Sequence, residues 1–275
     1  MIRVSIRCVM RAMYVSWAVM GILAVVVAPH AHAKPQFHLV WQSGFENGFP
    51  GEWHPYRTDA WSPGGTMPAD RVSAWTIASR AAGHPVYSGE HSYRGWISGR
   101  APVNHRAYPV IHASDPANIV APVTNPLVSS FMVWLDCDWS GMSSGEWIHL
   151  ASWANNTQWR VHTMSVRNRR LEFAHTEPFG GEYIGPLPVP DFPLRRWVRM
   201  TVYIEYNGDN GFVQAWQDGV AMLRAKITIP GNALLRAHWG MYAHPDVANA
   251  VQYNDDIRIW TLSAPLAELV TEPLP

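Results

Sequence analysis

Two neighbouring segments near the middle of the chain contain residue types that hydrolases use. Gly141-Met142-Ser143-Ser144-Gly145 matches the G-x-S-x-G turn that presents the nucleophile of many serine hydrolases. That turn leads into a helix, but a strand is predicted on either side here, so we interpret the segment as a hairpin loop. Asp136 and Asp138 alternate along the preceding predicted strand and share one face, where paired carboxylates can act as nucleophile and acid.

The chain is also rich in aromatic residues, which can pack a core or bind a ligand. The chain has 15 Trp and 10 Tyr. Indole faces pack protein cores, but they also stack on the apolar faces of sugar rings. We expect most of the Trp to be buried and a few to line a cleft; the candidates for exposed aromatics are Trp153, Trp159 and Trp216.

The elements that must position these residues are predicted to be strands. Prolines are too frequent before residue 126 for helices to persist. In the second half, apolar and mixed residues alternate with a period of two, as in the buried row Val198, Met200, Val202 and Ile204. Asp218-Gly219 predicts a tight hairpin. Many strands without helical crossovers predict an all-β sandwich of two antiparallel sheets, most simply a jelly roll.

The two ends of the chain are expected to lie outside the fold. Residues 1–33 combine a basic start, an apolar run and the small-residue ending Ala31-His32-Ala33, which predicts a cleaved signal peptide and a secreted protein, extracellular or periplasmic. A membrane anchor is the alternative, but the apolar run is short for a spanning helix. Residues 34–275 are then a single domain, with a loose C-terminal tail over 263–275.

Charge and cysteine content narrow the possible partners. Removal of the leader takes away three Arg and no acid, which leaves 18 basic and 21 acidic side chains. That balance argues against a nucleic-acid surface, which would need a basic stripe. Cys137 is the one cysteine left, so no internal disulfide can form. We expect a monomer with no membrane contact after signal cleavage.

Several motifs follow one another in a recognisable order: Phe45-Glu46-Asn47-Gly48, Ser88-Gly89-Glu90-His91-Ser92-Tyr93-Arg94, His105-Arg106-Ala107-Tyr108, the predicted strand Trp147 to Trp153, Trp197-Val198-Arg199-Met200-Thr201-Val202, Val213-Gln214-Ala215-Trp216-Gln217-Asp218-Gly219, His238-Trp239-Gly240-Met241-Tyr242 and Tyr253-Asn254-Asp255-Asp256-Ile257. This order resembles jelly-roll polysaccharide lyases of the concanavalin A-like lectin/glucanase superfamily, the group that includes heparin lyase I-like, glucuronan lyase-like and alginate lyase-like enzymes. The resemblance implies a concanavalin A-like jelly roll that acts on an extracellular polysaccharide. Non-catalytic lectin-like domains share the same scaffold.

The resemblance also implies where the site residues lie. Arg106 matches the Arg of the family's R-x-E-L strand, and Tyr242 matches the Tyr of K-x-G-x-Y, with His238 in place of the Lys. His149 matches the His of Q-x-H, where Trp147 replaces the Gln. These residues are expected on the concave sheet, and His238, Trp153, Asn155 and Trp159 are expected to contact the substrate.

The family's reaction is β-elimination from a uronate polymer, which needs three groups. One neutralises the sugar carboxylate, and Arg106 or Asn155 suits this role. A base removes the C5 proton, for which His149 or His105 is the candidate, and an acid protonates the leaving oxygen, for which Tyr242 is the candidate and can also be the base.

Acidic residues near the two ends of the domain suggest a cofactor. Asp255 and Asp256, together with Glu46, resemble a calcium position common in this superfold, where the first and last strands meet. Hard oxygen ligands suit calcium, in a structural role. The alternative is that these carboxylates cap a strand or accept backbone hydrogen bonds.

These observations predict a polysaccharide lyase, with two alternatives left open. A non-catalytic carbohydrate-binding protein would need only exposed aromatics. A glycoside hydrolase of the same fold is the weaker alternative, because the Glu-x-Asp-x-x-Glu strand of such enzymes is absent from the sequence. The lyase prediction requires Arg106, His149 and Tyr242 to converge on one face of a sheet.

Overall fold

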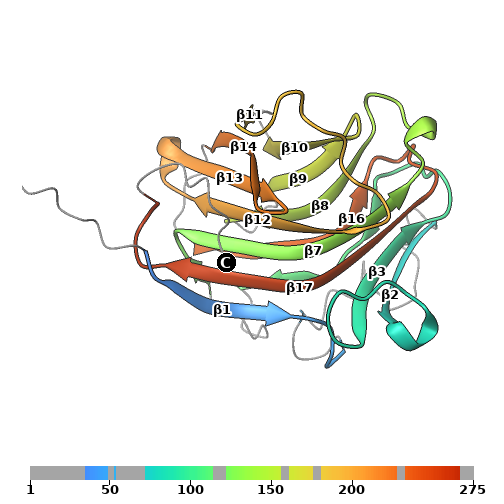
Figure 1. The fold of residues 1–275 in the computed structure, drawn as a ribbon, viewed down its shortest axis with the longest axis horizontal. Helices are drawn as coiled ribbons and strands as arrows, with labels where there is room; N and C mark the ends of the chain where they lie inside the picture. Colours follow the sequence, from blue (N-terminus) through green and yellow to red (C-terminus); the bar gives the residue numbers. More distant parts are fainter. Residues whose placement is uncertain are drawn as a thin grey trace, which may run out of the picture. The chain divides into compact units, whose positions relative to one another are not determined.

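Two antiparallel sheets form the layers of the structure, a computed structural model that describes residues 35–48, 53, 72–113, 122–155, 161–175, 181–227 and 233–266 (Figure 1). The larger sheet has nine strands in the order β11-β14-β13-β12-β7-β17-β3-β2, and β1 also pairs with β17. Its strands are β1 (Phe37–Ser43), β2 (Ser73–Ser79), β3 (His91–Ile97), β7 (Leu127–Cys137), β11 (Glu182–Tyr183), β12 (Trp197–Glu205), β13 (Gly211–Gln217), β14 (Val220–Ile227) and β17 (Ala250–Leu262).

The smaller sheet has six strands in the order β10-β9-β8-β16-β4, with β5 also paired to β16. Its strands are β4 (His105–Ala107), β5 (Val110–His112), β8 (Trp147–Ala154), β9 (Val161–Arg167), β10 (Arg170–His175) and β16 (Arg236–Ala243). A separate two-stranded ribbon joins β6 (Val123–Thr124) to β15 (Ala233–Leu234). The prediction of an all-β jelly-roll sandwich is confirmed.

The main core lies between the inner faces of the two sheets. Val198, Met200, Val202 and Ile204 of β12 are all fully buried there, as their alternation predicts. A second, smaller apolar cluster lies on the outer face of the nine-stranded sheet and contains Val128, Tyr203, Trp216, Trp260 and Leu262. The inner faces therefore supply most of the apolar burial that stabilises the sandwich.

Two of the predicted turns have different outcomes. Asp218 and Gly219 both have positive φ and join β13 to β14 in a tight hairpin, as predicted. The segment Gly141–Gly145 instead begins at the last residue of a short 3-10 helix, η2 (Trp139–Gly141), and lies in the connection from β7 to β8, which belong to different sheets. It is a crossover between the layers and not a hairpin, and no helix follows it.

The start of the C-terminal tail is held in place. Ser263 N–H donates to the carbonyl of Gln36 at 3.0 Å, and Leu266 N–H donates to Tyr203 Oη at 3.3 Å. These two hydrogen bonds connect residues 263–266, the described part of the predicted tail, to the sandwich. Residues 267–275 and the predicted signal peptide, 1–33, lie outside the described residues.

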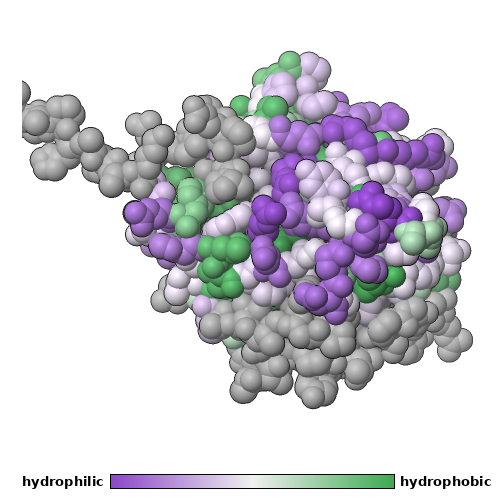
Figure 2. Space-filling view, turned by 60° about the horizontal axis from the view of Figure 1, so that its bottom comes forward, coloured by the Kyte–Doolittle hydropathy of each residue, from purple (hydrophilic) through white to green (hydrophobic). Residues whose placement is uncertain are grey.

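One face of the molecule shows both hydrophilic and hydrophobic residues at its surface (Figure 2). On the face drawn in Figure 2, hydrophilic residues predominate and the hydrophobic ones form several separate small groups. Within the described ranges, the chain forms no helix with the length and apolar character needed to cross a bilayer.

Candidate functional site

Arg106, Tyr242 and His149 form one continuous row across three strands of the six-stranded sheet. Tyr242 of β16 is the direct cross-strand partner of Arg106 on β4 and of His149 on β8. Their neighbours Ala107, Met241, Ala243 and Ile148 point into the core, so the row lies on the outer face. Neighbouring strands lie about 4.8 Å apart, which brings the three side chains together.

The side chains of this row are close enough to act together. The rings of His149 and Tyr242 meet edge to face with centroids 5.0 Å apart. The guanidinium of Arg106 lies 5.9 Å from the centre of the Tyr242 ring. Asn104 Nδ2 donates a hydrogen bond of 2.8 Å to Tyr242 Oη. The phenol oxygen therefore accepts a hydrogen bond from an amide donor, and a guanidinium lies beside the phenol ring.

A bulge in β16 places Tyr242 in this row. The pairing with β8 shifts between Trp239 and Tyr242, and Gly240 has φ +113°, a conformation that favours glycine. A Cβ at Gly240 would lie 2.8 Å from Cε1 of Tyr93. Glycine is therefore required at position 240, because the φ angle disfavours other residues and a Cβ would clash with Tyr93.

Aromatic rings surround the row. Trp147 stacks on His149 with centroids 4.2 Å apart and lies 5.2 Å from Tyr242. Tyr108 stacks on His238 at 3.8 Å and meets Tyr242 edge to face. His238, predicted to contact substrate, thus lies beside the row, with its ring 6.4 Å from that of Tyr242.

The two histidines are held in the neutral form. Burial, reinforced by the charge of Arg167, lowers the pKa of His149 to about 3. Burial also lowers the pKa of His238 well below its ordinary value, and His149 and Arg106 add to that shift. An imidazole with so low a pKa is a weak base, although it can still exchange hydrogen bonds with a ligand.

The sheet next to the row contains buried polar atoms that lack hydrogen-bond partners among the described residues. Ser165 lies across from His149, and Ser152 lies across from His238. Among the described residues, neither Ser Oγ atom has a hydrogen-bond partner, nor does Nδ1 of His149. Buried polar atoms of this kind are costly unless water or a ligand satisfies them.

His105 is not part of the row. It is fully buried, pairs with Ala243 on the core-facing side of β4, and its Nε2 lies 3.1 Å from the carbonyl oxygen of Pro245. The side chain of the candidate base His105 therefore faces away from the row, because adjacent residues of a strand point to opposite faces.

Of the predicted substrate contacts that the structure describes, His238 is the one that reaches the row. Trp153 is fully buried in the main core, and Trp216 is fully buried in the second cluster, so neither presents a ring at the surface on which a sugar could stack. Asn155 is 7% exposed and follows β8, six residues and so roughly 20 Å along the chain from His149. Trp159 lies outside the described residues.

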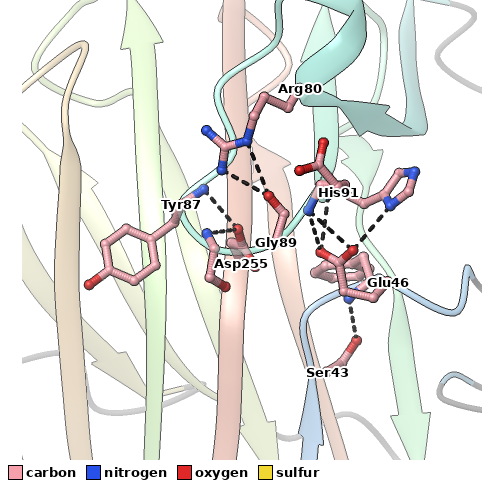
Figure 3. Close-up of polar contacts among 10 residues, drawn as sticks. Ser43, Glu46, Arg80, Tyr87, Gly89, His91 and Asp255 are labelled. Carbon is pink, nitrogen blue, oxygen red and sulfur yellow. Dashed lines mark hydrogen bonds and ion pairs between the residues drawn. The ribbon is translucent and has the colours of Figure 1, made fainter.

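The predicted calcium ligands hold a loop instead. Glu46 accepts hydrogen bonds from the N–H groups of Glu90 and His91 at 3.0 and 3.1 Å, and its second oxygen lies 3.3 Å from Nδ1 of His91 (Figure 3). Asp255 accepts from the N–H groups of Tyr87 and Ser88 at 2.8 and 3.0 Å. These contacts fasten residues 87–91 across β17 and the end of β1.

Asp256 has a different role. The β17 ladder shifts between Asp255 and Arg258, and Asp256 has φ +46°. Its carboxylate meets Arg199 at 2.8 Å and Arg258 at 2.7 Å. This bulge therefore directs Asp256 to two guanidinium groups on the outer face of the nine-stranded sheet.

These surroundings do not suit a calcium ion. The oxygens of Glu46 and Asp255 already accept N–H donors, and the two guanidinium groups beside Asp256 would repel a cation. In the described part of the chain, no group of three His, Cys, Asp or Glu side chains is arranged to hold a metal. The residues favour the hydrogen-bonded alternative over a calcium site.

The acid pair considered for hydrolysis is also engaged elsewhere. Asp136 accepts a hydrogen bond of 2.9 Å from Arg195 Nε. Asp138 caps the 3-10 helix by accepting from the N–H and hydroxyl of Ser140, and these bonds lower the pKa of Asp138. Neither carboxylate lies on the sheet that carries Tyr242.

Trp147 and Asn104 also contact the row, but only one of them could have been identified from the sequence. Trp147 lies two residues before His149 and therefore shares its face. Asn104 precedes β4, and nothing in the pattern indicates its bond to Tyr242.

Comparisons with known proteins support the fold. No family model matches the chain, and no curated protein matches its sequence. Among solved structures, the cellulose-induced protein Cip1 matches with a TM-score of 0.53 and 11% identity, over 79% of this chain and 95% of Cip1. This likeness supports the jelly-roll sandwich.

Two further structures show weaker likeness. The marine PL-14 alginate lyase from Aplysia kurodai has a TM-score of 0.48 and 10% identity, over 82% of this chain and 99% of the lyase. A GH131 β-glucanase catalytic domain from Podospora anserina has a TM-score of 0.44 and 10% identity, over 86% and 98% of the two chains.

Proposed function

We propose that this protein is an exported polysaccharide lyase that cleaves a uronate-containing polymer by β-elimination on the outer face of the six-stranded sheet. The observation that carries the proposal is the row Arg106–Tyr242–His149, with Asn104 hydrogen-bonded to Tyr242 Oη. The row joins a cation, a phenol and a neutral imidazole, which are the types of group that this elimination needs.

Arg106 binds the carboxylate of the uronate at the cleavage point. It is exposed and permanently charged, so it can neutralise that carboxylate without being deprotonated itself. Neutralisation acidifies the C5–H bond, because negative charge develops on the carboxylate as the proton leaves.

Tyr242 moves the protons. As the phenolate, it takes the C5 proton; the electrons of the C5–H bond form the C4=C5 double bond, and the C4–O4 bond breaks. The phenol then returns its proton to the departing O4, so the protein ends the reaction unchanged. The Asn104 donor and the Arg106 guanidinium lie beside the phenol, where they can balance the charge that moves during the cycle.

His149 is a better hydrogen-bonding partner than base. Its pKa of about 3 leaves it neutral at working pH and makes it a poor acceptor of the C5 proton. It orients the sugar beside Tyr242, while Trp147 offers a ring for stacking.

A carbohydrate-binding protein without catalysis is the second candidate function. The observation that favours it is the same low pKa of His149, since a sheet face with a weak base, a cation and aromatic rings can bind a glycan without cleaving it.

The test uses protein expressed with its own leader and purified from the medium. Edman sequencing is expected to give Lys34 as the first residue. The protein is incubated with alginate, glucuronan and heparin, with and without calcium, and the product is followed by the ultraviolet absorbance of its C4=C5 bond and by mass spectrometry. Unsaturated ends support the lyase. Binding to a polymer without unsaturated ends would leave the carbohydrate-binding function, and neither binding nor cleavage would contradict both.

A further inference from the structure

A cavity of about 390 Å³ lies away from the Tyr242 row, in the nine-stranded sheet, where β3 and β7 end and β17 begins. Its lining includes Asp136, Asp138, Arg195, Asn249 and Val251. This volume is within the range of pockets that bind small organic ligands. Nothing in the proposed elimination uses it.

Partly exposed tryptophans lie directly beside this cavity on the outer face of the sheet. Trp96 is the cross-strand partner of Val251, which lines the cavity. Trp134 lies two residues before Asp136 on the same face of β7, and Trp197 pairs with Trp134. The aromatic strip Trp96–Trp134–Trp197 spans β3, β17, β7 and β12, which is roughly 14 Å across three strand spacings.

Neighbouring side chains hold the rings of this strip in place. The guanidinium of Arg94 lies 4.4 Å from the centre of the Trp96 ring. Tyr253 meets Trp134 edge to face at 5.3 Å, and His84 Nδ1 lies 3.1 Å from Tyr253 Oη. Rings that are already ordered lose little conformational entropy when a ligand stacks on them.

The polar groups of the cavity suit hydroxyl groups better than a charged ligand. Asp136 and Arg195 form an ion pair of 2.9 Å, and Asp138 and Asn249 add exposed oxygen and amide groups. Over the cavity and the strip together, the two carboxylates are balanced by the guanidinium groups of Arg195 and Arg94, so an anionic chain gains no net attraction here. Mixed donors and acceptors beside flat aromatic rings match the edges and faces of a neutral sugar.

We propose that the aromatic strip and the adjoining cavity form a second glycan site, which binds an uncharged oligosaccharide. It is independent of the elimination, because the two sites are on different sheets of the sandwich. A protein with both sites can hold a neutral polysaccharide on one face while it acts on an acidic one at the other.

The test is titration of the full secreted protein with cellohexaose, xylohexaose and mannohexaose, followed by the indole N–H signals in NMR spectra. Trp96→Phe and Trp134→Phe assign their own signals by removing them. At least one of the neutral hexaoses is expected to shift the signals of Trp96 and Trp134. Trp96→Ala is expected to weaken its binding at least tenfold, and Asp136→Asn about threefold.

Tyr242→Phe is the matched control, since it alters an aromatic residue on the other sheet and is expected to leave the affinity for the neutral hexaose unchanged. Thermal unfolding of each variant establishes that it is folded. The proposal is overturned if none of the three hexaoses binds, or if Tyr242→Phe abolishes binding while Trp96→Ala does not. Neither result bears on whether acidic polymers are cleaved.

Discussion

The Tyr242 row and the loop fastened by Glu46 and Asp255 are both gathered from distant parts of the chain, but their polar groups are used differently. At the loop, carboxylate oxygens accept backbone N–H groups, and Asp256 nearby is matched to two arginines. In the row, His149 Nδ1 has no partner among the described residues, and Arg106 is exposed.

The difference distinguishes polar groups that stabilise the fold from polar groups that can bind a ligand. Groups that satisfy one another stabilise a fold, whereas groups left with hydrogen-bonding capacity are available to a ligand. Similar residue types can therefore form a ligand-binding site in one region and hold a loop in place in another. The comparison predicts that changes in the row reduce activity with little effect on stability, and that changes at the loop do the reverse.

Arg106→Ala is expected to reduce activity strongly. Loss of the cation that neutralises the uronate should lower kcat/KM by about 10² to 10³, in line with the loss of a preorganised electrostatic group. The melting temperature should change little, because the side chain is exposed. Arg100→Ala, which removes another exposed arginine, is the control in the same steady-state assay. An equal loss of activity in both variants would contradict the role of Arg106.

Asp255→Ala is expected to destabilise the protein. The change leaves the N–H groups of Tyr87 and Ser88 without their acceptor, at a cost of about 2 to 4 kcal/mol in the free energy of unfolding measured with urea. Asp138→Ala, which removes an exposed acid, should give a smaller loss. Activity per folded molecule should stay within about twofold of the wild type; a selective loss of activity would place Asp255 in the functional site.

His149 should make stability depend on pH. Its folded pKa of about 3 is below the unfolded value, so the unfolded state binds the extra proton and stability falls as the pH drops from about 6.5 towards 3. His149→Gln should remove this fall, so between pH 6.5 and pH 5 the wild type should lose about 2 kcal/mol more than the variant.

Asp255 changes stability in the opposite direction. Burial raises its pKa to about 6, so its contribution is greatest below the unfolded pKa and is lost as the pH rises through 6. Both proteins in the His149 experiment retain Asp255 and His238, and the difference between their urea curves therefore reports His149. Parallel pH profiles would show that His149 is not held neutral.

Calcium is expected to have the smallest effect. Because the carboxylates of Glu46, Asp255 and Asp256 are already matched to N–H and guanidinium donors, EDTA or millimolar calcium should leave the melting temperature unchanged. A clear calcium-dependent rise that Glu46→Gln abolishes would restore the calcium site.

Period-two alternation was sufficient to predict much of the fold. It identified the buried row of β12 and the sandwich, and the Asp218-Gly219 signal identified a real hairpin. The same alternation predicts that His105 and Arg106, which are adjacent in a strand, face opposite sides of the sheet, as the structure shows.

The sequence could not supply the shifts in strand register. Alternation alone would put Trp153 on the same face as His149, but the pairing of β8 with β9 shifts between His149 and Ala151. Leu150 and Ala151 both face the core as a result, and Trp153 follows them inward. One inserted residue in a ladder reverses every side chain beyond it, and its position depends on long-range pairing.

The central claim is that Tyr242 transfers the protons of the elimination, and the neighbouring Tyr108 provides a matched comparison. Both phenols lie beside His238, but only Tyr242 is in the row with Arg106 and His149. The decisive measurement is the initial rate of unsaturated product formation on the preferred polymer by Tyr242→Phe and Tyr108→Phe. The account predicts a loss of about 10³ or more for Tyr242→Phe and less than about tenfold for Tyr108→Phe. A folded Tyr242→Phe protein that retains the wild-type rate would contradict it.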